Sequence, residues 1–121
     1  MTEDKLSQTM TLGYAGMFSI VNLETDRPIG MMADIAMDKV ALSSWKELIP
    51  NTILNLRLRL PEAINGSVFV VFEAKCLTCT RESGQESYFA TLTYLSMTPS
   101  NKKRVHDLLV SLGKLEESPG Q

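Results

Sequence analysis

The segment that most constrains the fold covers residues 52–60 and reads TILNLRLRL. Leucine occupies every second position, and asparagine or arginine stands between the leucines. A period of two with one polar side predicts a β-strand that buries one face and exposes the other. Arg57 and Arg59 share the polar face. We interpret this face as the solvated outer surface of the sheet, and an anion-binding patch is the alternative. Pro61 is expected to end the strand, because proline cannot donate a hydrogen bond to a neighbouring strand.

Five further runs have the composition of strands, being rich in apolar, aromatic or β-branched residues and separated by turn-forming residues. They cover residues 14–24, 29–36, 39–44, 67–80 and 87–96. Six short antiparallel strands joined by polar turns favour a small closed barrel, because closure leaves no exposed sheet edge. The expected fold is therefore mainly β.

The pattern changes to that of a helix after residue 97. Thr98 is a suitable N-cap, Pro99 fits the first helical position, and Gly113 is a natural stop. A helix this short is not stable alone, so its apolar stripe must pack on the barrel. The stripe consists of Val105, Leu108, Leu109 and Leu112.

Length and composition fit one domain: 121 residues, of which 44% are hydrophobic. We expect a flexible N-terminal arm over residues 1–13, a barrel with its helix over 14–113, and a flexible tail over 114–121. The formal net charge of −2 argues against a dedicated nucleic-acid binder, which is normally basic. No apolar run is long enough to span a membrane and the N-terminus does not resemble a signal peptide, so a cytoplasmic location is expected.

Cys76 and Cys79 form a single C-x-x-C pair within a strand-like run. One pair cannot complete a tetrahedral zinc site, even with His106, so no metal site is expected. Because alternate strand residues point to opposite faces, Cys76 is expected inward and Cys79 outward, as two reduced structural thiols. No catalytic motif accompanies the lone histidine, so neither an enzyme activity nor a cofactor is predicted.

Three segments taken in order resemble the PilZ domain family: NLETDRPIGMMADIAMDKVALSS, LNLRLRLPEAINGSVFVVFEAKC and YFATLTYLSMTPSNKKRVHDLLVSL. The resemblance extends from about residue 14 to residue 112. It implies a six-stranded antiparallel barrel followed by a C-terminal helix. Many PilZ domains are bacterial receptors for cyclic di-GMP, so the resemblance also places this chain in that kind of signalling, connected with type IV pili, motility or surface behaviour.

The family's two ligand motifs are degraded in this chain. The first, Arg-x-x-x-Arg ahead of the barrel, is absent, since residues 1–26 contain no arginine. The second, Asp-x-Ser-x-x-Gly, is matched by Asp34, with Ala36 replacing the serine and Lys39 replacing the glycine. The chain thereby lacks the planar guanidinium forks and the hydroxyl that would hold a nucleotide. The resemblance therefore implies a degenerate site with weak cyclic di-GMP binding or none.

Two functional interpretations follow. In the first, the chain is a protein-interaction adaptor, and Lys102, Lys103 and Arg104 at the start of the helix are candidates to meet an acidic protein partner. In the alternative, it is a cyclic di-GMP receptor that binds in an unusual mode through Asp34 and Arg27. A single-stranded nucleic-acid binder ranks last, because the chain is acidic and poor in aromatic residues.

Overall fold

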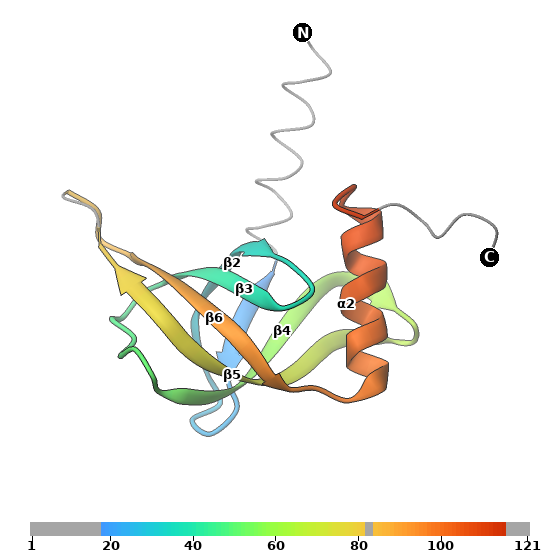
Figure 1. Ribbon diagram of the computed structural model, residues 1–121, viewed down its shortest axis with the longest axis horizontal. Coiled ribbons are helices and arrows are strands. Elements are labelled where there is room, and N and C mark those ends of the chain that lie inside the picture. The colour runs from blue at the N-terminus through green and yellow to red at the C-terminus, as the bar shows by residue number, and fades with distance from the viewer. Residues whose placement is uncertain (1–17, 82–83, 116–121) are drawn as a thin grey trace, which may run out of the picture.

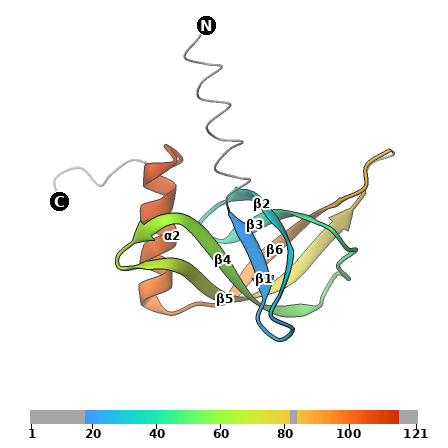
Figure 2. The same cartoon turned by 180° about the vertical axis from the view of Figure 1, so that it is seen from behind.

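The computed structural model describes residues 18–81 and 84–115. Within them the chain forms a closed, wholly antiparallel barrel with the strand order β1-β2-β3-β6-β5-β4, followed by one helix (Figures 1 and 2). The prediction of a six-stranded barrel with a C-terminal helix is confirmed. The elements are β1 (Ser19–Asn22), β2 (Arg27–Ile35), β3 (Lys39–Ser44), β4 (Ile53–Ile64), β5 (Ser67–Thr80), β6 (Tyr88–Ser96) and α2 (Pro99–Ser111).

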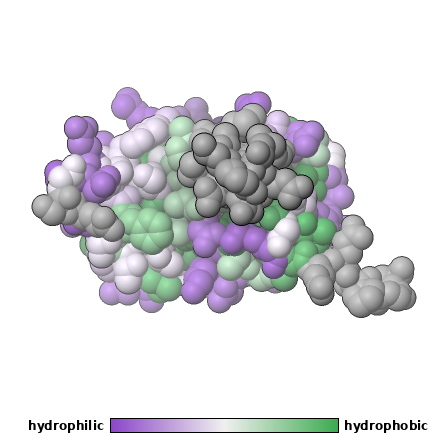
Figure 3. Space-filling model, turned by 90° about the horizontal axis from the view of Figure 1, so that it is seen from above, coloured by the Kyte–Doolittle hydropathy of each residue, from purple (hydrophilic) through white to green (hydrophobic). Residues whose placement is uncertain are grey.

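The alternating leucines of β4 build the centre of the core. Leu56, Leu58 and Leu60 point inward and are at most 1% exposed. The arginines between them lie on the outer face, where the guanidinium carbon of Arg57 stands 4.5 Å above the centre of the Phe69 ring. Figure 3 shows hydrophilic and hydrophobic residues interspersed on the face seen from above.

Helix α2 stands beside the β4–β5 hairpin and covers one end of the barrel (Figures 1 and 2). Its predicted start is confirmed, because the Thr98 hydroxyl accepts a hydrogen bond from the Asn101 backbone at 3.2 Å. The chain leaves the helix at Gly113, whose φ of +77° suits glycine. The inward side of the helix is formed by Val105, Leu108 and Leu109.

The prediction that Pro61 ends its strand is wrong. β4 continues to Ile64, but its pairing with β5 shifts between Arg59 and Ile64. Pro61 lies in this shifted stretch, where a missing backbone N–H removes no regular ladder bond. The long β4–β5 hairpin therefore projects far enough to reach α2.

The first strand is shorter than predicted at its C-terminal end. β1 ends at Asn22, because the Asn22 side chain and carbonyl accept hydrogen bonds from Glu24 and Asp26 and start a turn. Asp26 adopts a φ of +58°. Arg27 and Pro28, expected in the turn, already belong to β2. The start of the predicted run, residues 14–17, lies outside the described residues.

The two cysteines are free thiols, and one of their predicted orientations is wrong. Cys76 is fully buried, as expected. Cys79 is half-buried and packs against the same core, and its sulfur accepts a hydrogen bond from the Leu48 backbone at 3.3 Å. The pairing of β5 with β6 shifts between Cys76 and Thr78. This bulge adds one residue, so residues three apart come to face the same side.

The predicted boundaries at the two ends are tested only in part by the described residues. The arm over 1–13 and residues 116–121 lie outside them. The first two residues of the predicted tail contact the rest of the domain, since the Lys114 backbone bonds to the Leu109 carbonyl at 2.8 Å and Leu115 packs against the core. Among the described residues, no helix has the length and apolar character needed to cross a membrane.

Candidate functional site

The turn between β2 and β3 brings together three of the four predicted ligand residues. Asp34 is the penultimate residue of β2, Lys39 begins β3, and the Ala36 backbone donates a 2.8 Å hydrogen bond to the Lys39 carbonyl. Arg27 is not part of this group, because it begins β2 seven residues before Asp34. An extended strand of that length places them roughly 20 Å apart, at opposite ends of the barrel.

The carboxylate of Asp34 is already engaged. One of its oxygens lies 2.7 Å from the Lys114 ammonium and accepts a 2.9 Å hydrogen bond from the Ile35 backbone. The hydrogen bond from Lys114 is the main reason why the pKa of Asp34 is lowered, and the charge of Lys39 acts in the same direction. The last turn after α2 thus supplies a cation to the Asp34 carboxylate.

Lys39 stands where the resemblance to PilZ domains predicts glycine, and the backbone accommodates lysine there. None of the described residues 36–39 has a positive φ, so this turn does not require glycine's conformational freedom. The lysine therefore adds a long side chain and a point charge without backbone strain. Ala36 offers no hydroxyl to a ligand.

Strand β6 holds the β2–β3 turn in place. The Asp38 carbonyl accepts hydrogen bonds from the Thr93 hydroxyl at 3.1 Å and from the Tyr94 backbone at 3.2 Å. Burial, and to a lesser extent the charge of Asp38, raise the pKa of the Tyr94 phenol. The turn is thus fixed against the barrel, and it presents two carboxylates, those of Asp34 and Asp38.

The sequence reasoning missed two residues of this site. Lys114 lies beyond the predicted helix, and no local pattern connects it to Asp34, 80 positions earlier. Phe89, which is 50% exposed, lines a small cavity of about 180 Å³ with Asp34, Ala36 and Lys39. The alternation of β6 did contain a signal for Phe89, because Ala90 and Leu92 are inward and their neighbours must face outward.

The predicted basic cluster at the start of α2 is divided by the fold. Arg104 donates hydrogen bonds to the carbonyls of Ile64 and Asn65, at 3.0 and 3.3 Å, and so holds the β4–β5 turn. Lys103 lies 3.5 Å from Asp107 on its own helix. Lys102 lines a cavity that also includes Asp38. The three cations thus have different surroundings.

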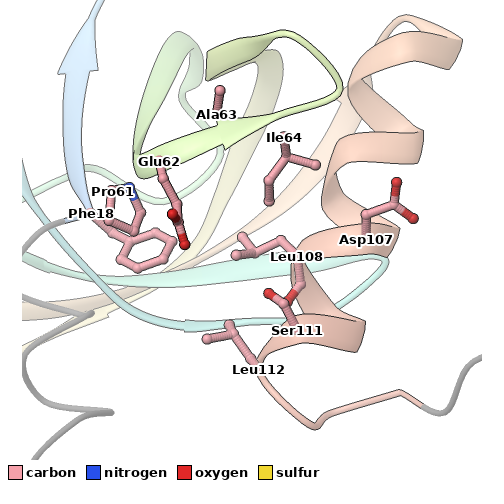
Figure 4. A pocket seen from close by; sticks show the side chains of 9 residues that line it. All are labelled: Phe18, Pro61, Glu62, Ala63, Ile64, Asp107, Leu108, Ser111 and Leu112. Atoms are coloured by element: carbon pink, nitrogen blue, oxygen red, sulfur yellow. The ribbon is translucent and has the colours of Figure 1, made fainter.

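A second cavity lies between α2 and the end of β4 (Figure 4). Phe18, Leu108 and Leu112 supply apolar side chains, and Glu62 and Asp107 bring carboxylates to it. Hydrogen bonds from the Asn65 amide and from His106 lower the pKa of Asp107. This cavity contains none of the predicted ligand residues. Within the described residues, no cluster of His, Cys, Asp or Glu could hold a metal ion.

The chain matches no known family model and no curated protein sequence. Its fold does match solved structures. The Bacillus subtilis inhibitor of motility MotI/DgrA superposes with a TM-score of 0.66 and 16% identity, over 83% of this chain and 48% of that one. The PilZ domain of Escherichia coli YcgR with c-di-GMP superposes with a TM-score of 0.58 and 11% identity, over 80% and 81% of the two chains.

The Borreliella burgdorferi PlzA protein in complex with c-di-GMP gives a TM-score of 0.50 and 18% identity, over 84% of this chain and 46% of that one. These neighbours are PilZ-domain proteins. The chain therefore has the PilZ fold. It spans about half the length of MotI/DgrA and PlzA, and most of the isolated YcgR domain.

Proposed function

We propose that this chain is an adaptor with a PilZ fold that works by contacting a protein partner in the bacterial cytoplasm. It acts in cyclic di-GMP-related signalling, in the control of type IV pili, motility or surface behaviour. It binds the nucleotide weakly or not at all. The proposal assigns the chain no enzyme activity, cofactor or metal.

The missing ligand contacts carry this proposal, and the pairing of Asp34 adds to it. The carboxylate is paired with Lys114 at 2.7 Å, so a guanine edge must compete with an ammonium group for it. The neighbouring Asp38 adds negative charge where a ligand with two phosphates would lie. Each missing hydrogen-bond partner typically costs on the order of 1–3 kcal/mol, and the chain lacks two arginines and a serine. Together these losses remove most of the expected affinity.

The neighbours support the signalling context. Two of them were solved with c-di-GMP, and the third is described as an inhibitor of motility. A PilZ fold that has lost the nucleotide contacts but keeps its barrel is suited to the same systems as a binding partner. Lys102 and Lys103, at the exposed start of α2, remain our candidates for contact with an acidic partner, whereas the hydrogen bonds of Arg104 assign it a structural part.

Isothermal titration calorimetry with cyclic di-GMP tests the proposal. We expect no heat of binding in the micromolar range, with the E. coli YcgR PilZ domain as the positive control. A dissociation constant near 1 μM, about −8 kcal/mol, would overturn the proposal in favour of an unusual receptor.

A double variant, Ala36→Ser with Lys39→Gly, separates the two causes of lost affinity. If the absence of the Arg-x-x-x-Arg motif is the main cause of the lost affinity, this variant still shows no heat of binding. If the variant gains micromolar affinity, the turn alone was responsible and the proposed importance of the arm is wrong.

A further inference from the structure

The β1–β2 turn and the loop that follows β3 lie at the end of the barrel remote from the β2–β3 turn (Figures 1 and 2). A groove lies between them. We call it the Trp45 groove. Its volume of about 640 Å³ lies within the range of sites that hold ligands or peptide side chains. Its lining includes four apolar residues, which we call its floor, and three charged residues, which we call its rim. The floor is Pro28, Ile29, Trp45 and Leu48, and the rim is Arg27, Lys46 and Glu47.

Hydrogen bonds fix the walls of the Trp45 groove. Ser44, the only fully buried polar residue among those described, donates its hydroxyl to the Lys46 carbonyl at 2.5 Å and accepts from the Lys46 backbone at 3.2 Å. The Trp45 backbone donates to the Ile29 carbonyl at 3.0 Å. Leu48 donates to the sulfur of Cys79 at 3.3 Å. A groove held in this way is preorganised, so an occupant orders few groups when it binds.

The floor of the groove exposes a large apolar side chain to solvent. Trp45, the only tryptophan of the chain, is 52% exposed. Ile49, which follows the lining residues in the same loop, is 70% exposed. Apolar patches of this kind mark binding surfaces, and tryptophan and arginine are the residues most often found at the energetic centre of protein interfaces. The Trp45 groove has both.

The charges at the rim point to the chemistry of the occupant. Arg27 and Lys46 form no ion pair with any described residue, and neither does Glu47, the one acidic residue that lines the groove. Two cations and one anion give the lining a net positive charge, whereas the whole chain carries −2. Guanidinium and ammonium groups at the edge of an apolar floor suit carboxylate oxygens placed next to an apolar side chain.

We propose that the Trp45 groove docks an extended segment of a partner protein that carries an apolar side chain beside carboxylates. The apolar side chain packs on Trp45, and a carboxylate pairs with Arg27 or Lys46. This inference rests on the proposed adaptor function and assigns it a surface. It also gives Arg27 a role in partner binding, away from the degenerate nucleotide site.

Tryptophan fluorescence offers a direct test, because Trp45 is the only emitter of its kind. The full chain is titrated with the peptide acetyl-GLLDDG-amide and with two analogues, GLLKKG and GAADDG. We expect a saturable change in Trp45 emission with the first peptide, with a dissociation constant of about 1 mM or below, and at least about tenfold weaker binding of both analogues. No saturation up to about 5 mM, or equal binding of the lysine analogue, overturns the proposal.

Charge-reversal variants locate the binding. Arg27→Glu is expected to weaken binding of the first peptide by about tenfold, and the matched control Lys75→Glu, on the outer face of β5, by less than about twofold. Equal effects of the two variants overturn the assignment to the groove. Sedimentation of the free chain tests whether a second copy of the chain occupies the groove instead. A dimer whose formation changes Trp45 emission would show that it does and would contradict the proposal.

These outcomes are separate from those of the calorimetry. Cyclic di-GMP binding at the β2–β3 turn would refute the adaptor function. The Trp45 groove lies at the opposite end of β2, so the peptide titration would still report on the groove independently. A flat peptide titration with no nucleotide binding removes the groove and leaves the adaptor function standing.

Discussion

At Gly30 the backbone of β2 approaches β3 so closely that no side chain fits between them. A Cβ atom added there would lie 2.0 Å from the Ser43 carbonyl oxygen, which belongs to rigid strand backbone. Gly30 also pairs with Ser44, the buried residue that anchors the wall of the Trp45 groove. One missing side chain thus sets the spacing of two strands and the start of the loop that carries Trp45.

We expect Gly30→Ala to lower the free energy of unfolding by at least about 2 kcal/mol, because two strands must move apart to accept the methyl group. Urea denaturation followed by circular dichroism measures the change. Gly66→Asn is the comparison, since Gly66 has open space around it but a φ of +84°. This variant tests backbone strain without a steric clash, and we expect it to cost less. Equal losses in both variants would mean that the close approach is not as tight as the structure indicates.

The ion pair of Asp34 and Lys114 has a consequence for pH. Because the folded pKa of Asp34 is lowered, the pair stabilises the fold above the unfolded pKa and this contribution disappears as the pH falls below about 4. Both side chains are largely exposed to solvent, so we expect a contribution of no more than about 0.5 kcal/mol. Lys114→Ala should raise the pKa of Asp34, measured by NMR titration of its carboxyl carbon, and an unchanged pKa would contradict the pairing.

At the scale of elements, Arg104 joins α2 to the β4–β5 turn. Besides the carbonyls of Ile64 and Asn65, its guanidinium bonds to the Asn101 side chain at 2.9 Å. The turn itself needs this support, because Asn65 and Gly66 both have positive φ and the pairing beyond Arg59 is irregular. The helix and the hairpin stabilise each other through one planar side chain.

We expect Arg104→Ala to reduce the free energy of unfolding by about 1–3 kcal/mol, because it leaves backbone carbonyls without their donor. Lys102→Ala, two positions earlier and exposed, should change it by less than about 0.5 kcal/mol. Arg104→Lys should restore only part of the loss, since an ammonium cannot make the forked contact. Thermal unfolding curves measure these changes in stability. Similar losses for Arg104→Ala and Lys102→Ala would refute the structural role of Arg104.

At the scale of the whole molecule, closure of the barrel makes one core from all six strands and the helix. The described core is continuous from Phe18 to Leu109, and the Trp45 loop is attached to it through Ser44 and Cys79. A domain of this size with a single core is expected to unfold as one unit. The two ends of the barrel differ in chemistry: one has the paired carboxylate of Asp34, the other an apolar groove with a cationic rim.

Trp45 emission and far-UV circular dichroism should therefore give the same midpoint in urea. Leu58→Ala, in the centre of the core, should shift both midpoints equally and cost about 2–5 kcal/mol. A transition of Trp45 at lower urea than that of the strands would show that the groove opens independently, which would weaken the argument that it is preorganised.

The sequence by itself determined the strands in which apolar and polar residues alternate strongly, and the capped helix. These depend on neighbours within a few positions, where the period of two in β4 and the Thr98 cap can be read directly. The barrel followed from the number of strands and the resemblance to PilZ domains.

The tertiary structure alone decided which distant side chains meet. The ion pair of Asp34 with Lys114, the bonds from Arg104 to the β4–β5 turn and the inward position of Cys79 all depend on strand register and on one bulge. Register is a property of paired strands, which no single segment contains. The separation of Arg27 from Asp34, and the groove that Arg27 shares with Trp45, exist only because closure of the barrel places the two ends of β2 far apart.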